Sequence, residues 1–289
     1  MLYCLASALS FSAMPFLANA AYAAGMGLAE LLLIRFVVAA IALWVLVAVR
    51  RPPLRRARFA VIGLGLGGVG YATQSGLYFA ALAYNGPSLN TLLLYTFPVI
   101  VFIVLLARRR ERATPARLLA LALALGGVAV VLSGTGSAEL HPVGLALGLG
   151  TALAYAAYIL VGEAVDETLD RILLSAFVCT GAAATYLLVN VGSGGPRIDF
   201  TPGGWLWAAA LGLVATAFAL TAFFAGMRLV GAASASIISC VEPVATVLIA
   251  VSLFSDRLSP LQLLGALAVV TAVVLLQRRQ TTEPSPAPA

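Results

Sequence analysis

The sequence predicts an all-α membrane protein with ten transmembrane helices, arranged as two inverted five-helix repeats. Of its 289 residues, 62% are hydrophobic and 10% are charged, and the mean hydropathy is +1.04. A soluble domain has about 45–50% apolar and about 25% charged residues, so this composition excludes a soluble enzyme, a disordered chain and a fibrous protein. A membrane β-barrel is excluded too, because it needs alternating segments of about 10 residues, which the sequence lacks.

The apolar residues fall into ten separate runs, and a helix needs about 20 mostly apolar residues to cross a bilayer. The expected spans lie near 2–22, 30–49, 59–83, 87–107, 115–133, 143–162, 171–191, 204–227, 233–254 and 260–276. The first is interpreted as a membrane helix, because a signal peptide opens with basic residues and residues 1–29 contain none. The proline-rich residues 278–289 are expected to form a disordered tail.

The positions of the basic residues predict the orientation in the membrane. All seventeen are arginines and give a net charge of +6. With ten spans, fourteen lie in the connections on one side or at the C-terminus, whereas Arg197 and Arg257 lie on the other side. Connections rich in arginine stay in the cytoplasm. We therefore expect a multi-pass inner (plasma) membrane protein with both termini cytoplasmic, and no nucleic-acid partner.

An internal repeat appears when the chain is compared with itself at an offset of 145 residues. The matches that are not simply apolar are Gly86 with Gly231, Pro98 with Pro243, Glu111-Arg112 with Asp256-Arg257, and Pro115 with Pro260. Each half has five spans, an odd number, so the second half must enter the membrane in the opposite sense. The repeats are expected over 1–135 and 142–277, and inverted repeats recur among secondary transporters.

The most specific motifs lie in the second half, over residues 212–217, 231–233, 241–244 and 255–266. In these stretches, and over all ten spans, the chain resembles the EamA-type transporters of the drug/metabolite transporter superfamily. It departs from the family pattern at Phe11-Ser12, Tyr155-Ala156 and Ser255-Asp256. The resemblance implies a ten-helix exporter, in some members an importer, of small metabolites such as amino acids, driven by an ion or concentration gradient.

Glu242 is the first candidate functional residue. It lies about 13 Å into the bilayer by helical rise, where a charged carboxylate costs at least about 2.5–3.5 kcal/mol. It should therefore face a cavity, be paired or be protonated, which would suit proton coupling or a cationic substrate group. The alternative is structural, with Glu242 satisfying backbone groups freed by Pro243. The equivalent of Glu242 is Phe97, before Pro98, so the proline alone does not require an acid.

Arg35 is the second intramembrane charge. It lies about 7 Å from the outer end of the second span by helical rise. Helical side chains lean toward the N-terminus, so Arg35 can extend to the lipid headgroups or form structural hydrogen bonds. The alternative is contact with a substrate carboxylate. Direct pairing with Glu242 is disfavoured, because their expected depths differ.

Other polar side chains and helix breaks complete the candidate site. Pro98 and Pro243 interrupt the fourth and ninth spans at equivalent positions, and backbone groups freed at membrane depth need cover from protein or a cavity. Polar-tipped side chains within spans are Tyr71, Gln74, Tyr78, Tyr95, Tyr155 and Tyr158. The first three share a helix face by their spacing. As a group they predict the wall of a polar cavity, and individually they could form helix–helix hydrogen bonds.

We expect secondary active transport of small organic metabolites, with amino-acid or related metabolite export favoured, by alternating access. The sequence has no carboxylate–histidine cluster, Ser/His/Asp arrangement or phosphate-binding loop, so no enzyme activity, cofactor or metal is expected. The partners are a small-molecule substrate, the lipid bilayer and protons as a candidate coupling ion. One alternative is a proton-coupled multidrug or cationic amine exporter. Another, of a different class, is a lipid-handling or receptor protein without solute transport.

Overall fold

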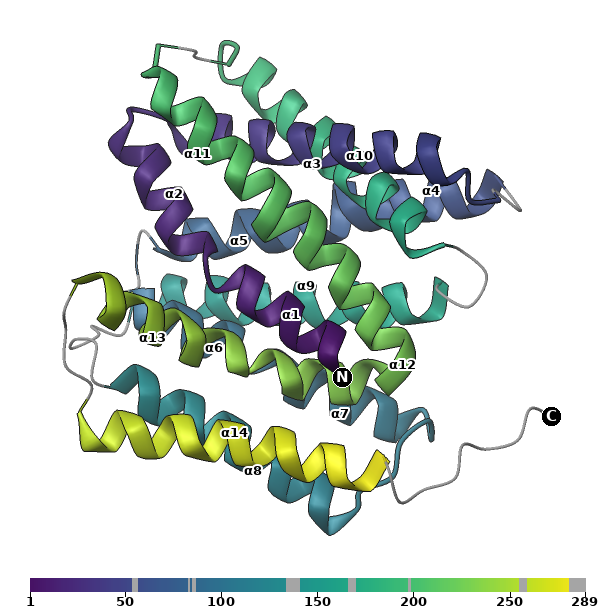
Figure 1. Cartoon of the computed structure of the whole chain (residues 1–289), viewed down its shortest axis with the longest axis vertical. Coiled ribbons are helices and arrows are strands. Elements are labelled where there is room, and N and C mark those ends of the chain that lie inside the picture. Colours follow the sequence, from purple (N-terminus) through teal and green to yellow (C-terminus); the bar gives the residue numbers. More distant parts are fainter. Residues whose placement is uncertain are drawn as a thin grey trace.

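The computed structural model describes residues 1–289 except 54–56, 83, 85–86, 134–140, 166–169, 197–198, 255–258 and 281–289. The described residues form helices and short connections, with no strand among them. Most helices lie side by side in one bundle, and the connections gather at its two ends (Figure 1). The C-terminal ends of α3 (Leu28–Arg50) and α7 (Phe97–Ala107) lie at the same end, on the right of Figure 1.

The first half of the chain contains, besides α3 and α7, the elements α1 (Leu2–Phe11), α2 (Met14–Ala23), α4 (Ala57–Gly65), the π-helical segment η1 (Leu66–Tyr71), α5 (Ala72–Leu82), α6 (Pro87–Leu94) and α8 (Pro115–Ser133). The second half contains α9 (Pro142–Val165), α10 (Arg171–Gly192), α11 (Pro202–Gly212), the π-helical segment η3 (Leu213–Phe218), α12 (Ala219–Ser239), α13 (Val241–Phe254) and α14 (Pro260–Gln280). Because α14 continues to Gln280, residues 278–280 are helical and not part of a disordered tail; the tail from 281 lies outside the described residues.

Seven stretches of described helix are long and apolar enough to cross a membrane. They are Leu2–Ala23, Leu28–Arg50, Asn90–Ala107, Pro115–Ser133, Pro142–Glu163, Arg171–Gly192 and Pro202–Ser239, and a shorter apolar helix covers Pro260–Leu275. The expected third span is helical as α4, η1 and α5, but its glycines and its polar Gln74 and Ser75 make it less apolar. The expected eighth span and the start of the ninth are joined in the stretch Pro202–Ser239.

Several expected spans are interrupted. Turn residues Tyr95 and Thr96 separate α6 from α7, and Cys240 separates α12 from α13. Tyr95 and Cys240 are 145 residues apart, so the fourth and ninth spans break at equivalent positions. Pro98 and Pro243 lie in the first turns after these breaks, where a missing backbone N–H costs little. They therefore begin new helices.

The first span also breaks, at a position that was not predicted. Ser12 and Ala13 separate α1 from α2, and Pro15 is the second residue of α2. A further break lies inside α12, where Gly231 has φ +77°. The carboxylate of Glu163 in α9 accepts a hydrogen bond from the backbone N–H of Ala232 at 2.8 Å. It thereby caps the helical part that follows Gly231.

The two π-helical segments occupy similar positions in the two halves, and glycines bring both against neighbouring helices. A Cβ atom on Gly67, in η1, would collide with the carbonyl oxygen of Val178 in α10. A Cβ atom on Gly212, just before η3, would lie 2.8 Å from the carbonyl oxygen of Arg35 in α3. Gly67 and Gly212 are 145 residues apart. Gly67 therefore lets the backbones of η1 and α10 approach closely.

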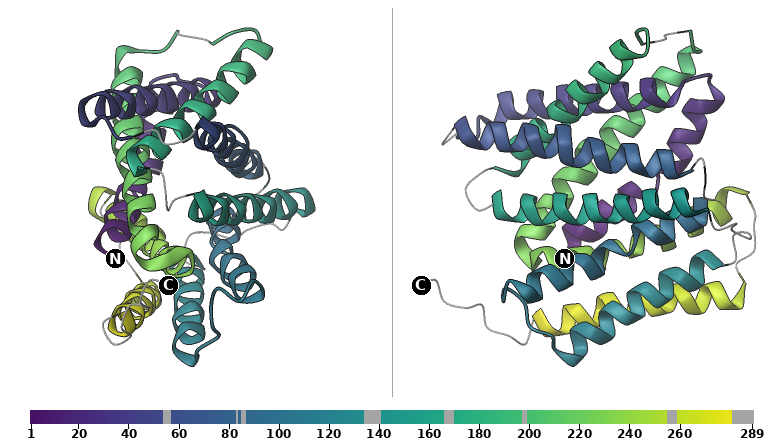
Figure 2. Two further views of the ribbon diagram at one scale, coloured as in Figure 1. Left: turned by 90° about the vertical axis from the view of Figure 1, so that its right-hand side faces the viewer. Right: turned by 180° about the vertical axis from the view of Figure 1, so that it is seen from behind.

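Two helix pairs have the most extensive contacts and lie toward opposite edges of the bundle. They are α3 with α10, and α8 with α14 (Figures 1 and 2). In the second pair, a Cβ atom on Gly127 would lie 2.6 Å from the carbonyl oxygen of Gly265, and one on Gly265 would lie 2.8 Å from that of Gly127. The helices α1, α5, α9, α12 and α13 pack between these edges, and they position the site.

Candidate functional site

Arg35 lies in the interior of the bundle, held by side chains from three other elements. Its Nε donates a hydrogen bond to Thr216 Oγ1 of η3 at 2.7 Å, and its Nη2 donates to the hydroxyl of Tyr71 in η1 at 2.8 Å. Its Nη1 points to the sulfur of Met14 in α2 at 3.6 Å. The guanidinium also lies 4.9 Å from the ring centre of Phe36, a favourable cation–π distance.

The expectation that Arg35 extends to the lipid headgroups is wrong. Its side chain is only 2% exposed, and good acceptors are available inside the protein. Helical rise gives the depth of Arg35 along α3. It does not show that η1 and η3 place the hydroxyl groups of Tyr71 and Thr216 beside the Arg35 side chain. Of the interpretations left open by the sequence, structural hydrogen bonding describes what these contacts do, and a substrate contact remains a proposal.

Glu242 lies in the first turn of α13 and is half-buried. Its carboxylate accepts a hydrogen bond from the Tyr95 hydroxyl, which projects from the break between α6 and α7. Glu242 is also within electrostatic range of Arg35. Glu242 follows the break between α12 and α13. The hydrogen bond of its carboxylate therefore joins this break to the equivalent break between α6 and α7 in the first half.

A row of aromatic rings runs between the two charged residues. Tyr95 lies 5.8 Å from Phe97, which lies 4.6 Å from Tyr155. Tyr155 stacks on Tyr158 at 6.1 Å, and Tyr158 stacks on Tyr71 at 5.3 Å. Because Tyr71 binds Arg35 and Tyr95 binds Glu242, this row of residues from η1, α7, α9 and the turn before α7 connects the two charges through the core.

The other predicted site residues lie near this row or beside it. Tyr78 forms a hydrogen bond with Thr91 at 3.3 Å and is within electrostatic range of Glu242. Gln74 is buried and accepts a hydrogen bond from Ser75 at 3.4 Å. The hydroxyl of Tyr158 is buried and has no hydrogen-bond partner in the described structure. A buried polar atom without a partner is unusual in a native protein, so this hydroxyl is available to a bound molecule.

Sequence reasoning missed Thr216, Phe36 and Met14. A signal for Thr216 was present, because it stands 145 residues after Tyr71 and is therefore its equivalent in the second half. The break at Ser12, which places Met14 at the start of a new helix, was signalled by Pro15. Nothing in the sequence marks Phe36 as facing the interior.

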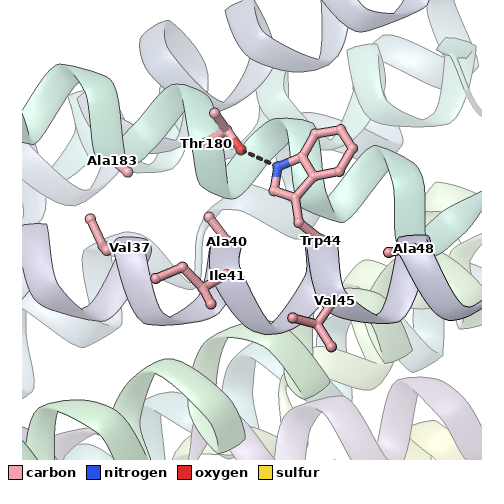
Figure 3. A pocket seen from close by; sticks show the side chains of 8 residues that line it. All are labelled: Val37, Ala40, Ile41, Trp44, Val45, Ala48, Thr180 and Ala183. Carbon is pink, nitrogen blue, oxygen red and sulfur yellow. Dashed lines mark hydrogen bonds between the residues drawn. The ribbon is translucent and has the colours of Figure 1, made fainter.

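A separate apolar groove lies on the surface of the bundle between α3 and α10 (Figure 3). It has a volume of about 500 Å³, and the indole N–H of Trp44 donates to Thr180 Oγ1 at 2.9 Å within it. Its lining residues Ile41 and Val45 are 60% and 59% exposed, and an apolar exposed surface of this kind suits contact with lipid chains. It contains no charged side chain and is not the candidate site.

Comparison with known proteins identifies the family. The model of the EamA-like transporter family matches residues 1–133 and 142–278. An uncharacterized transporter of Archaeoglobus fulgidus is 32% identical over 220 residues, which are 74% of this chain and 76% of that protein. The uncharacterized transporter YwfM of Bacillus subtilis is 26% identical over 223 residues, covering 75% and 74% of the two chains.

One solved crystal structure has the same fold, with a TM-score of 0.84 at 20% identity, covering 96% of this chain and 97% of that one. The fold, the apolar helices and the family match over both halves agree with one another. The chain belongs to the EamA-like transporter family, a family of multi-pass membrane transporters.

Proposed function

We propose that the protein exports small organic metabolites, with amino acids and related compounds favoured, as a secondary active transporter. Transport would proceed by alternating access between two inverted five-helix halves, 1–135 and 142–277. The two stretches matched by the family model support this division. So do the equivalent breaks at Tyr95 and Cys240 and the similarly placed segments η1 and η3, because inverted repeats with broken helices are typical of transporters.

The observation that carries the proposal is the pair of interior charges joined by aromatic rings. Arg35 and Glu242 come from opposite halves, and the stacked tyrosines between them provide apolar faces with polar tips. Intramembrane charges are costly and usually mark a substrate or ion pathway. A small molecule with polar ends and an apolar body would match such an arrangement.

In this proposal Glu242 is the residue that responds to the coupling ion or to a cationic group of the substrate. Its hydrogen bond to Tyr95 supports the role, since a proton or an ammonium group bound by Glu242 would compete with this contact. Both partners lie at helix breaks, Tyr95 in the turn between α6 and α7 and Glu242 just after Cys240. Binding at Glu242 would thus act on the backbone of both halves at once.

We also propose that the protein lies in the inner (plasma) membrane with both termini in the cytoplasm. The support is the arginine distribution together with the placement of helix ends. Arg50 ends α3 and Arg108 follows α7, and these two helix ends lie at the same end of the bundle. Arg50 and Arg108 are both exposed.

The test is solute flux in proteoliposomes. The full-length protein is reconstituted, and uptake or counterflow of radiolabelled amino acids is measured with and without an imposed pH gradient. We expect flux that depends on the gradient and a loss of at least about tenfold, equivalent to about 1.4 kcal/mol, in Glu242→Gln. Glu111→Gln is the matched control, because Glu111 pairs with Arg117 at the end of the bundle.

Three outcomes would redirect the proposal. Glu242→Gln with unchanged flux across a pH series would contradict the coupling role. Proton-dependent extrusion of cationic dyes, in the absence of amino-acid flux, would favour a multidrug or cationic amine exporter. Binding or scrambling of lipid without any solute flux would favour a lipid-handling protein.

A further inference from the structure

We propose that Arg35 binds the carboxylate of the transported molecule, and that Tyr71 and Thr216 are positioning residues, one from each half, that hold its guanidinium for this contact. The inference rests on the proposed function and names one recognition element of its substrate. The hydrogen-bond partners of the buried Arg35 guanidinium are all neutral groups.

The positive charge of Arg35 is deeply buried but not paired with a carboxylate. Its three hydrogen-bond partners are a threonine hydroxyl, a tyrosine hydroxyl and a methionine sulfur. The ion pair between Arg117 and Glu111 lies away from this site, at the end of the bundle. Glu242 is within electrostatic range of Arg35 but forms no direct ion pair with it, and a buried charge without a directly bound counter-ion is unfavourable. An anionic group that enters with the substrate would remove this penalty.

The guanidinium also has hydrogen-bonding capacity to spare. It carries five N–H donors in a planar fork, and two of them are directed to good acceptors, Thr216 Oγ1 and the Tyr71 hydroxyl. The Nη1 group is directed only to the sulfur of Met14, at 3.6 Å, and thioether sulfur is a weak acceptor. A carboxylate is the acceptor that matches the remaining edge of the fork.

The two oxygen acceptors fix the plane of this fork. Thr216 donates its own proton to the carbonyl oxygen of Leu211 at 3.0 Å, five residues earlier, within the π-helical region. Its oxygen lone pairs are therefore free to accept from Nε. Tyr71 ends η1, is 5% exposed, and is fixed by its stacking on Tyr158.

Tyr71 and Thr216 occupy equivalent positions, 145 residues apart, and each lies in the π-helical segment of its half. Arg35 is thus the point where both segments meet through side chains. π-helical turns are frequent at functional sites. The Tyr158 hydroxyl, buried and without a partner, lies on the neighbouring ring and offers a further contact to a molecule bound there.

The test compares substrates that differ only in the carboxylate. A panel of amino acids and their carboxamides competes for uptake by reconstituted full-length protein. For wild-type protein we expect the acid to compete at least about tenfold better than its amide, the scale of one strong charge-assisted contact. In Arg35→Gln this preference should disappear while the amide still competes. Arg58→Gln, at the exposed start of α4, is the matched control and should keep the preference.

The positioning residues give a second arm that does not depend on the folding of Arg35→Gln. Tyr71→Phe and Thr216→Val keep the shape of the side chains and remove one acceptor each. Each should lower the acid-to-amide preference partially, and the double variant should lower it further. Arg35→Lys, which keeps the charge but loses the fork, should retain part of the preference.

Different results would contradict different statements. If the acid and its amide become weaker competitors by the same factor in the Arg35 and positioning variants, Arg35 has a structural role. The inference is then overturned, while the proposed transport stands. The same follows if wild-type protein takes up amino acids without preferring the acid. Wild-type protein that transports no member of the panel would contradict the favoured amino-acid substrate and, with it, this inference.

Discussion

The fourth and ninth spans break at the same place but carry different chemistry. In both, the helix stops just before a proline and restarts, with Tyr95 and Cys240 at equivalent turns. Yet the residue before Pro98 is the buried Phe97, whereas the residue before Pro243 is Glu242. The difference shows that the break is a property of the architecture, while the acid is a feature of one half. The hydrogen bond from Tyr95 to Glu242 then joins the two breaks.

The largest contrast in stability is expected at the glycines beside the π-helical segments. In Gly67→Ala the new Cβ atom would collide with the backbone of α10, whereas in Gly212→Ala it would lie 2.8 Å from the Arg35 carbonyl and 3.0 Å from Val38 Cβ. Overpacking typically costs about 1–3 kcal/mol, occasionally more, and we place Gly67→Ala at or above this range and Gly212→Ala within it. Thermal unfolding in detergent measures both. Equal melting temperatures would show that η1 and η3 adapt equally.

The prolines test whether the two breaks contribute equally to transport. Alanine restores the backbone donor and removes the ring, so Pro98→Ala and Pro243→Ala both favour a continuous helix. We expect about a tenfold loss of flux, about 1.4 kcal/mol, for Pro243→Ala, because Glu242 precedes it. A smaller loss is expected for Pro98→Ala. Flux assays in proteoliposomes measure both variants. A larger loss of flux in Pro98→Ala than in Pro243→Ala would contradict this expectation.

The cap that Glu163 provides in the second half gives a smaller effect. Glu163 caps the helical part after Gly231, but its equivalent in the first half is Ala18. Loss of a cap costs about 1 kcal/mol, so Glu163→Ala should destabilise the protein by that amount, and Glu163→Gln, which keeps an acceptor oxygen, should destabilise it less. Chemical unfolding of the reconstituted protein measures both changes. If Glu163→Ala left the free energy of unfolding unchanged, the helical part after Gly231 would need no cap.

The smallest effect is expected at Tyr158. Its hydroxyl has no partner in the described structure, so Tyr158→Phe removes an unsatisfied group and should leave stability unchanged or slightly raised. Tyr71→Phe, which removes an acceptor of Arg35, should be the more destabilising of the two. Melting temperatures of the two variants make the comparison, and a large drop for Tyr158→Phe would indicate a partner bound to its hydroxyl.

Hydropathy predicted the helical membrane class, the resemblance of the motifs in the second half predicted the family, and the repeated prolines predicted the breaks at Pro98 and Pro243. They also selected Arg35, Glu242, Tyr71 and Tyr95, which the structure brings into one hydrogen-bonded and aromatic system. Whether these residues act on a substrate stays a prediction. The division into two five-helix repeats also stays a proposal, supported by the placement of the breaks.

The direction of the Arg35 side chain could not be predicted, because it depends on acceptors from η1 and η3 rather than on depth in the bilayer. The π-helical segments themselves were also not predicted. Each lies where a glycine brings the helix against a neighbour, as Gly67 does against Val178, and such long-range packing cannot be predicted from the local sequence. The break at Ser12 was missed because Pro15 was not weighed against the apolar length of the first span.

The crossing of α8 and α14 at Gly127 and Gly265 limits where a solute can pass. Their main chains touch there, and each glycine faces the carbonyl oxygen of the other. At this crossing the two helices leave no room for a metabolite, and sliding one along the other would drive the peptide groups together. We therefore expect α8 and α14 to move together as one unit during transport. The helices that separate would be those that carry Arg35 and Glu242.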